Sequence, residues 1–225
     1  MLNFFAVPIT DEWGTTYQLT TAGYTALVLI MIALLLLACF IGNSISKPRF
    51  STRQLVFSAM AIAAAMVTSF IKLFDLPMGG SVTLLSMLFI CLIGYWYGLR
   101  AGLMTAIAYG FLQLISDPYI ISLPQMLVDY IFAFGALGLS GVFSNSKNGL
   151  IKGYLLGVLG RYFFAFLSGL IFFGVYAADY NMSAPVYSLV YNGAYLGAEA
   201  LLTIIVLSLP PIKKVMAQLK TMAKA

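Results

Sequence analysis

Histidine is absent from the 225-residue chain, and only seven of its side chains are acidic. Without histidine or a cluster of acids, a transition-metal site has almost no ligands from which it could be built. A Ser-His-Asp catalytic set is excluded as well, and there is no Walker A motif to bind the phosphates of ATP. We therefore expect no metal, no cofactor and no enzymatic activity in this chain.

Charged side chains are scarce. They make up 8% of the residues, whereas hydrophobic residues make up 62%. A soluble domain carries about 25% charged residues, so this chain could not cover a water-facing surface. The composition predicts an integral membrane protein, and long apolar runs indicate an all-α membrane fold.

Seven apolar runs are each near the roughly 20 residues that a helix needs to cross a bilayer. They cover residues 20–45, 54–73, 81–97, 101–116, 120–143, 151–177 and 186–209. The two shortest, 81–97 and 101–116, are separated only by "GLR" and could be full spans or a tight helical pair. The first run is too long for the core of a signal peptide and has no basic segment before it, so we do not expect it to be cleaved.

Basic residues gather at alternate ends of the predicted spans. They are Lys47, Arg49, Arg53, Arg100, Lys147, Lys152, Lys213, Lys214, Lys220 and Lys224. The opposite ends carry Asp11, Glu12, Asp75, Asp117 and Asp179, with Lys72 as the one base near them. By the positive-inside rule, the N-terminus lies outside the cell membrane and the C-terminus lies in the cytoplasm. This asymmetry explains the net charge of +5, so the expected surroundings are membrane lipid, and we expect no nucleic acid partner.

Apart from charges at span ends, which can reach the membrane surface, three charged residues fall inside the predicted spans: Asp129, Arg161 and Glu199. A charge in hydrocarbon costs roughly 2.5 kcal/mol or more and marks a candidate functional site. At 1.5 Å per residue, Arg161 and Glu199 reach compatible depths on consecutive antiparallel helices, so we expect a structural ion pair between them. Asp129 is left without an obvious partner in the protein, and a cationic ligand would stabilise its carboxylate.

Polar and aromatic residues share faces of the last predicted span. Asn192, Tyr195 and Glu199 lie on one face, and Tyr187, Tyr191 and Tyr195 recur at every fourth residue. Together with Tyr119, near the outer end of the fifth span, they predict an outward-facing pocket. Such a pocket would suit a small cationic or aromatic ligand, through ion pairing and cation–π contact. For Tyr119 and Tyr187, an interfacial aromatic belt is the competing interpretation.

The second run contains the stretch "SAMAIAAAM", in which Ala59 and Ala63 lie four residues apart. Small residues at this spacing let two membrane helices approach closely. The pattern is compatible with ordinary packing inside the protein. It is equally compatible with a docking face for another membrane subunit.

Three stretches match a known family in order and spacing. They read "YIISLPQMLVDYIFAFGALGLSGVF" at 119–143, "RYFFAFLSGLIFFGVYA" at 161–177 and "APVYSLVYNG" at 184–193. On these words, the chain from about Arg53 to its end resembles the thiamine-specific S-component of energy-coupling-factor (ECF) vitamin transporters. The resemblance implies a six-helix substrate-binding membrane domain at 51–225. Residues 1–50 would be an N-terminal extension with one additional transmembrane helix.

The resemblance also implies a function and partners. Such a subunit captures a vitamin from outside and associates with a transmembrane coupling subunit and two cytoplasmic ATPase subunits. By similarity, Ala59 and Ala63 form the docking face, and the ligand-binding residues are Asp129, Tyr130, Tyr119, Tyr187 and Asn192.

This chain departs from the family pattern at several positions. Asp129 replaces a glutamate, Ala165 a histidine and Phe173 a tryptophan, whereas Glu199 is an acid that the family does not supply. The ligand implied is thiamine, held by Asp129 and Phe173, or else a hydroxymethylpyrimidine precursor or another vitamin-like compound.

Other interpretations of the same residues lead to different functions. A self-sufficient carrier of a small cationic or aromatic metabolite could use Asp129 or Glu199 as a proton site. A membrane enzyme acting on lipids is disfavoured by the absence of histidine and of clustered acids. A purely structural subunit would bind no ligand, and replacing Asp129 would then change no binding assay.

Overall fold

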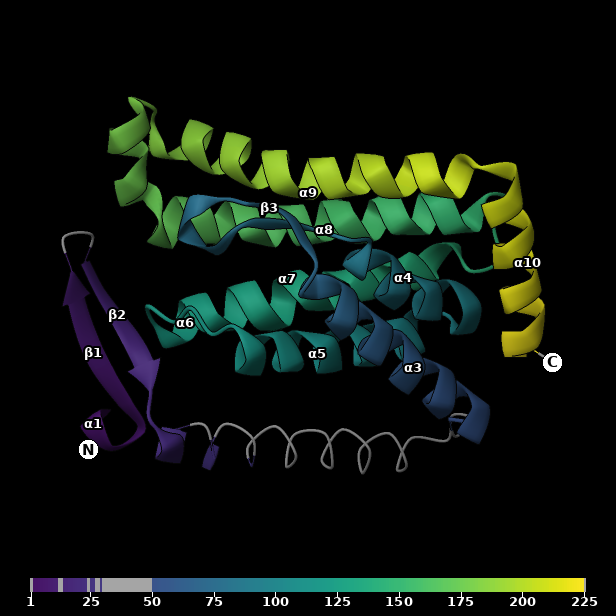
Figure 1. The fold of residues 1–225 in the computed structure, drawn as a ribbon, viewed down its shortest axis with the longest axis horizontal. Coiled ribbons are helices and arrows are strands. Elements are labelled where there is room, and N and C mark those ends of the chain that lie inside the picture. Colours follow the sequence, from purple (N-terminus) through teal and green to yellow (C-terminus); the bar gives the residue numbers. More distant parts are fainter. Residues whose placement is uncertain (1, 12–13, 24, 27–28, 30–49, 225) are drawn as a thin grey trace.

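The computed structural model describes residues 2–11, 14–23, 25–26, 29 and 50–224 (Figure 1). Most of the first predicted run, 20–45, and with it the predicted N-terminal transmembrane helix, falls outside these residues. The described N-terminal part holds a short helix, α1 (Leu2–Phe5), and an antiparallel hairpin of β1 (Ala6–Asp11) and β2 (Gly14–Leu19). The sequence analysis predicted no strand here.

Six helical segments form the core of the described structure. They are α3 (Thr52–Ser69), α4 (Ser86–Tyr97), α5 (Leu99–Ser116), the segment Leu123–Phe143, α8 (Gly149–Phe172) and α9 (Ala184–Ser208). Four of these, namely α5, the 123–143 segment, α8 and α9, are long and apolar enough to cross a membrane. The predicted helical, multi-pass membrane fold is thus confirmed, with two small hairpins added to it.

Helix α4 lies at the centre of this core. It packs against α3, α5, α8 and the 123–143 segment, and nine of its twelve residues are buried, so most of its surface faces protein rather than lipid. The predicted run 81–97 is therefore a short helix preceded by a strand. The helix begins only after Leu85, which has a φ of 61°. A leucine in this left-handed region interrupts regular helix, which limits α4 to about 18 Å in length.

The hairpin that precedes α4 consists of β3 (Lys72–Asp75), a 3₁₀ turn, η1 (Pro77–Gly79), and β4 (Ser81–Thr83). The predicted run 54–73 therefore ends as a helix at Ser69 and continues as strand. In the view of Figure 1, the hairpin lies over part of α8. Antiparallel pairing satisfies backbone groups that a loop at membrane depth would leave without partners.

The segment Leu123–Phe143 is not one regular helix. It consists of α6 (Leu123–Met126), a wide π-type turn, η2 (Leu127–Phe132), α7 (Ala133–Gly135) and a tight 3₁₀ stretch, η3 (Ala136–Phe143). Asp129 and Tyr130 lie in the π-type turn. Such turns occur frequently at functional sites, because they change the direction of side chains within an otherwise helical segment.

Close backbone approach holds η3 against its neighbours. A Cβ placed on Gly138 would lie 2.4 Å from the backbone nitrogen of Leu103, and one on Gly141 would lie 2.3 Å from that of Leu99. No side chain fits at either position. Small residues thus allow η3 and α5 to pack backbone against backbone, as is common between membrane helices.

Helix α9 runs beside α8 and is followed by α10 (Pro210–Lys224), which turns across one end of the core (Figure 1). Ile212, Met216 and Leu219 of α10 pack against the core. At its end the Tyr97 hydroxyl donates to the Ala223 carbonyl at 2.9 Å. From the sequence, the lysines of this segment served only to assign the orientation; the structure shows that the segment is an amphipathic helix.

Candidate functional site

A cavity of about 340 Å³ lies between the β3–β4 hairpin, α5, the 123–143 segment, α8 and α9. Its volume is within the range of small-molecule sites, roughly 300–1,000 Å³. All seven residues predicted to bind substrate line it: Tyr119, Asp129, Tyr130, Phe173, Tyr187, Asn192 and Tyr195. The structure therefore gathers residues from three segments of the sequence into one wall, while their role in binding stays a prediction.

Gln125 positions the carboxylate of Asp129. Its amide nitrogen donates to Asp129 Oδ2 at 2.6 Å and to the Tyr119 carbonyl at 3.1 Å, while its amide oxygen accepts from the backbone of Ile121 at 3.1 Å. Gln125 is 1% exposed, so its amide makes these contacts inside the protein. The sequence analysis missed Gln125. Its spacing of four residues before Asp129 could have indicated the contact.

Tyr130 holds the loop between α5 and α6 in place. Its hydroxyl donates to the Asp117 carbonyl at 2.9 Å and accepts from the Tyr119 backbone nitrogen at 2.8 Å. The Tyr119 ring, fixed in this way, lies 5.8 Å from the Phe173 ring between centroids. Tyr119 and Phe173 thus form an aromatic surface at the cavity, suited to a flat or cationic ring.

Asn192 connects α8 and α9 at the cavity wall. Its amide nitrogen donates to the carbonyl of Ala165 at 3.2 Å and to that of Ser188 at 2.9 Å, and its amide oxygen accepts from the Tyr195 hydroxyl at 3.0 Å. The Tyr187 hydroxyl, by contrast, is buried and has no hydrogen-bond partner among the described residues. Of these polar groups, the Tyr187 hydroxyl has the most unused hydrogen-bonding capacity.

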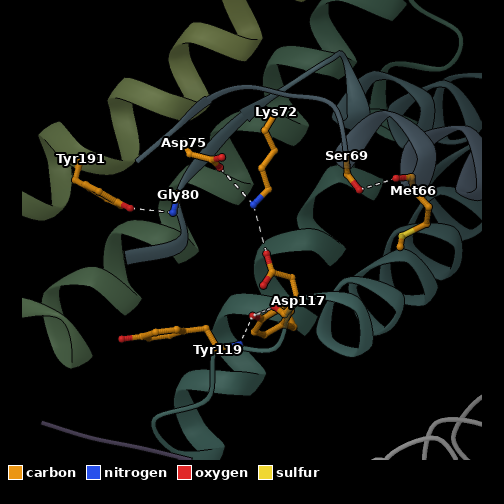
Figure 2. A network of polar contacts seen from close by, with 9 residues as sticks. Met66, Ser69, Lys72, Asp75, Gly80, Asp117, Tyr119 and Tyr191 are labelled. Carbon is orange, nitrogen blue, oxygen red and sulfur yellow. Dashed lines mark hydrogen bonds and ion pairs between the residues drawn. The ribbon is translucent and has the colours of Figure 1, made fainter. Parts of the chain in front are cut away.

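The β3–β4 hairpin borders the cavity, and Figure 2 shows two of its attachments to the rest of the protein. The Tyr191 hydroxyl accepts from the backbone of Gly80 at 2.9 Å and donates to the carbonyl of Pro77. Lys72 Nζ lies 3.3 Å from Asp75 Oδ1 and 3.7 Å from Asp117 Oδ2, so it links the hairpin to the end of α5. These contacts connect the hairpin to α9 on one side and to the end of α5 on the other.

The predicted ion pair between Arg161 and Glu199 requires correction, because within the described residues no ion pair joins them: both ion pairs there involve Lys72. Glu199 accepts from the backbone nitrogens of Thr83 at 3.2 Å and Met87 at 3.1 Å. It also accepts from the hydroxyls of Thr83 at 2.6 Å and Ser86 at 3.2 Å.

Glu199 therefore caps the first turn of α4, whose own N-terminal residue makes no side-chain cap. The orphan backbone donors at a helix start attract a carboxylate, which explains why Glu199 is satisfied without arginine. The guanidinium of Arg161 instead lies over the Phe134 ring, 4.0 Å from its centroid, as a cation–π contact. Both residues line the cavity.

Two positions on α8 complete the wall. Ala165 is 8% exposed and contributes only a methyl group and its carbonyl. Ser168, three residues further on, is 1% exposed, and its hydroxyl has no hydrogen-bond partner among the described residues. The sequence analysis missed Ser168, because a single serine in an apolar helix usually bonds to its own backbone.

The two alanines of the predicted docking face lie on the outside of α3. Ala59 and Ala63 are exposed, whereas Ala61 and Ala65 are buried against the core. Neighbouring apolar side chains on this helix are also exposed, with Met60 at 61%. The small-residue stripe at 59 and 63 therefore faces away from the core packing, as a contact with another membrane helix requires.

No group of three or more metal-ligating side chains occurs among the residues that the structure describes. The cavity lining instead holds the carboxylates of Asp117, Asp129 and Glu199, the cations of Lys72 and Arg161, several hydroxyls and a set of aromatic rings. This combination can hold a small polar heterocycle by hydrogen bonding and stacking.

Comparison with known proteins gives consistent matches. A family model described as thiamine transporter protein (Thia_YuaJ) matches residues 55–219, nearly the whole six-helix core. The thiamine transporter ThiT of Bacillus subtilis (strain 168) is 32% identical over 172 residues, covering 69% of this chain and 88% of that protein. The structure of ThiT from Listeria monocytogenes matches with a TM-score of 0.58 and 29% identity, over 70% of this chain and 94% of that one.

Proposed function

Because the chain belongs to the thiamine transporter protein family, we propose that it is the substrate-binding (S) subunit of an ECF-type vitamin uptake transporter. The ligand proposed is thiamine or a pyrimidine precursor of thiamine. A transporter subunit in a multi-pass membrane fold needs no catalytic residues of its own. The function then depends on the cavity and on the surfaces that meet the partner subunits.

The observation that carries the proposal is the composition of the cavity wall. An oriented carboxylate, Asp129, accepts hydrogen bonds from an amino group or pairs with a cation. The rings of Tyr119 and Phe173 offer a stacking surface for a flat heterocycle. Thiamine carries both an aminopyrimidine and a cationic thiazolium ring, so it matches the two kinds of group.

Two features keep the pyrimidine precursor as a candidate ligand. Ala165 supplies a methyl group where the resemblance implies histidine, and Phe173 is a smaller ring than tryptophan. Both changes reduce the polar and aromatic contact available to a second ring. A ligand that consists only of the aminopyrimidine half has no second ring, so these two changes would cost it less binding free energy.

We also propose an orientation and partners. The cavity is bordered by Asp75 and Asp117 near its hairpin, whereas the basic helix α10 lies at the end of the core opposite α6 (Figure 1). By the positive-inside rule the cavity faces outward and α10 faces the cytoplasm. The exposed alanines of α3 would then contact a transmembrane coupling subunit, which works with two cytoplasmic ATPase subunits.

The test is a titration of the purified full-length protein, followed by intrinsic fluorescence, with thiamine and then with its aminopyrimidine half alone. Saturable quenching by thiamine at sub-micromolar concentration supports a thiamine site. A tight response to the pyrimidine alone assigns the precursor as ligand. Failure of both to bind, with the protein folded by its melting transition, would overturn the proposed ligand class.

A further inference from the structure

Ser168 is a buried polar residue of the cavity wall whose hydroxyl makes no hydrogen bond of regular geometry to the described residues. Its side chain is 1% exposed. Serine inside a helix commonly donates to the carbonyl one turn earlier, but Ser168 does not. A buried hydroxyl with incomplete hydrogen bonding costs free energy. A ligand group in the cavity that hydrogen-bonds to Ser168 would remove that cost.

Another serine of the cavity lining, Ser188, offers a contrast. Ser188 lies on α9, and its hydroxyl donates to the Phe166 carbonyl at 2.7 Å. Ser188 thus stabilises the contact between α8 and α9 and keeps little capacity for a ligand. Ser188 shows that a serine at this wall can donate to a backbone carbonyl. Its position in an apolar helix therefore does not explain why Ser168 has no such partner among the described residues.

Ser168 and Asp129 both line the cavity, and the Ser168 hydroxyl interacts with the Asp129 carboxyl, so the hydroxyl hydrogen faces the carboxylate and the lone pairs of Oγ are left for a ligand donor. Asp129 is held there by Gln125 through Oδ2. Ala165, on the same side of α8, presents no polar side-chain atom. Helix α8 therefore contributes two polar side chains near Asp129: the hydroxyl of Ser168, and the guanidinium of Arg161, which lies over the Phe134 ring.

We propose that Ser168 is a specificity-determining ligand contact, which rests on the function proposed above. Its Oγ accepts one hydrogen of the exocyclic amino group of the ligand's pyrimidine, and the Asp129 carboxylate accepts the other. An amino group directs two hydrogens in one plane, and two adjacent acceptors match it. A carbonyl oxygen at the same ring position would instead face the Asp129 carboxylate. Because both groups are hydrogen-bond acceptors, they would repel each other, and the oxo compound would bind more weakly.

The experiment compares thiamine with its analogue that carries a 4-oxo group in place of the 4-amino group. Binding of each to the full-length wild type, Ser168→Ala and Ser140→Ala is measured by calorimetry. Ser140 is the matched control, because its hydroxyl is also buried and unpartnered among the described residues but lies outside the cavity lining. The four affinities for wild type and Ser168→Ala form a cycle that isolates the contact with the amino group.

Ser168→Ala is expected to bind thiamine roughly tenfold more weakly and to bind the oxo analogue almost as the wild type does. Its discrimination between the two compounds therefore falls, whereas Ser140→Ala keeps both affinities. If Ser168→Ala does not fold, Ser168→Cys serves instead, since a thiol is only a weak hydrogen-bonding group.

If Ser168→Ala binds thiamine as tightly as the wild type does, the assignment of Ser168 is overturned, while the proposed function still stands. Equal losses for both compounds would also overturn the assignment, because they would indicate a structural role. A folded wild type that binds neither thiamine nor its pyrimidine half would overturn the proposed function, and the assignment with it.

Discussion

At the scale of residues, Asp129 combines a position in a π-type turn with a carboxylate oriented by Gln125. We predict that Asp129→Ala weakens thiamine binding at least about tenfold, because a hydrogen bond to a charged group contributes about 1.5–3 kcal/mol. Isothermal calorimetry on purified protein measures the change. Asp179→Ala is the control, since Asp179 is exposed and does not line the cavity. Equal affinities for wild type and Asp129→Ala would contradict the prediction.

At the scale of elements, Glu199 connects α9 to the hairpin and to the first turn of α4. We predict that Glu199→Leu lowers the free energy of unfolding by about 1–3 kcal/mol, because the buried donors of Thr83 and Met87 lose their acceptor. The melting temperature in detergent measures it. The alternative is the ion pair with Arg161 that the sequence predicted, and it is tested with Arg161→Leu and the double variant. If the ion pair existed, the double variant would be less destabilised than the sum of the effects of the two single variants.

Helix α3 carries the second prediction at this scale. Ala59→Leu and Ala63→Leu should reduce the recovery of complex with the coupling subunit roughly tenfold, because added bulk in a close helix contact costs about 1–3 kcal/mol. Copurification of the subunits measures assembly, and calorimetry should show unchanged ligand binding. Ala198→Leu, at an exposed alanine of α9, is the matched control. Normal assembly and uptake by both α3 variants would remove this face from the interface.

At the scale of the whole molecule, charge asymmetry along the chain predicts its orientation in the membrane, with the N-terminus outside and the C-terminus in the cytoplasm. We predict that a membrane-impermeant maleimide labels Asp179→Cys in intact cells, whereas Lys214→Cys is labelled only after the cells are permeabilised. Cys39→Ser and Cys91→Ser provide the background for both variants. Labelling with the opposite pattern would place the cavity on the cytoplasmic side and would exclude capture of a vitamin from outside.

Much of the fold and of the candidate site could be predicted from the sequence. Hydropathy along a helix is a local property, so the apolar runs alone indicated a helical membrane protein. The cost of a charge in hydrocarbon singled out Asp129 and Glu199, and both line the cavity. Helical spacing likewise brought Asn192 and Tyr195 together, and they do form a hydrogen bond.

Other features depend on contacts between residues far apart in the sequence. The acceptor role of Glu199 depends on Thr83, which lies 116 positions earlier, so spacing could not distinguish a helix cap from an ion pair with Arg161. The irregular turns of residues 123–143 require close packing at Gly138, which local propensity does not encode.

The sequence by itself thus determined the class of protein and the residue types of a candidate site, because burial in lipid constrains each span separately. Only the tertiary structure decided which polar groups are satisfied within the protein. Ser188 has a carbonyl partner and Ser168 has none among the described residues, although both are serines in apolar helices. That difference arises from how α8, α9 and the 123–143 segment pack, since hydrogen bonds depend on distance and angle rather than on residue type.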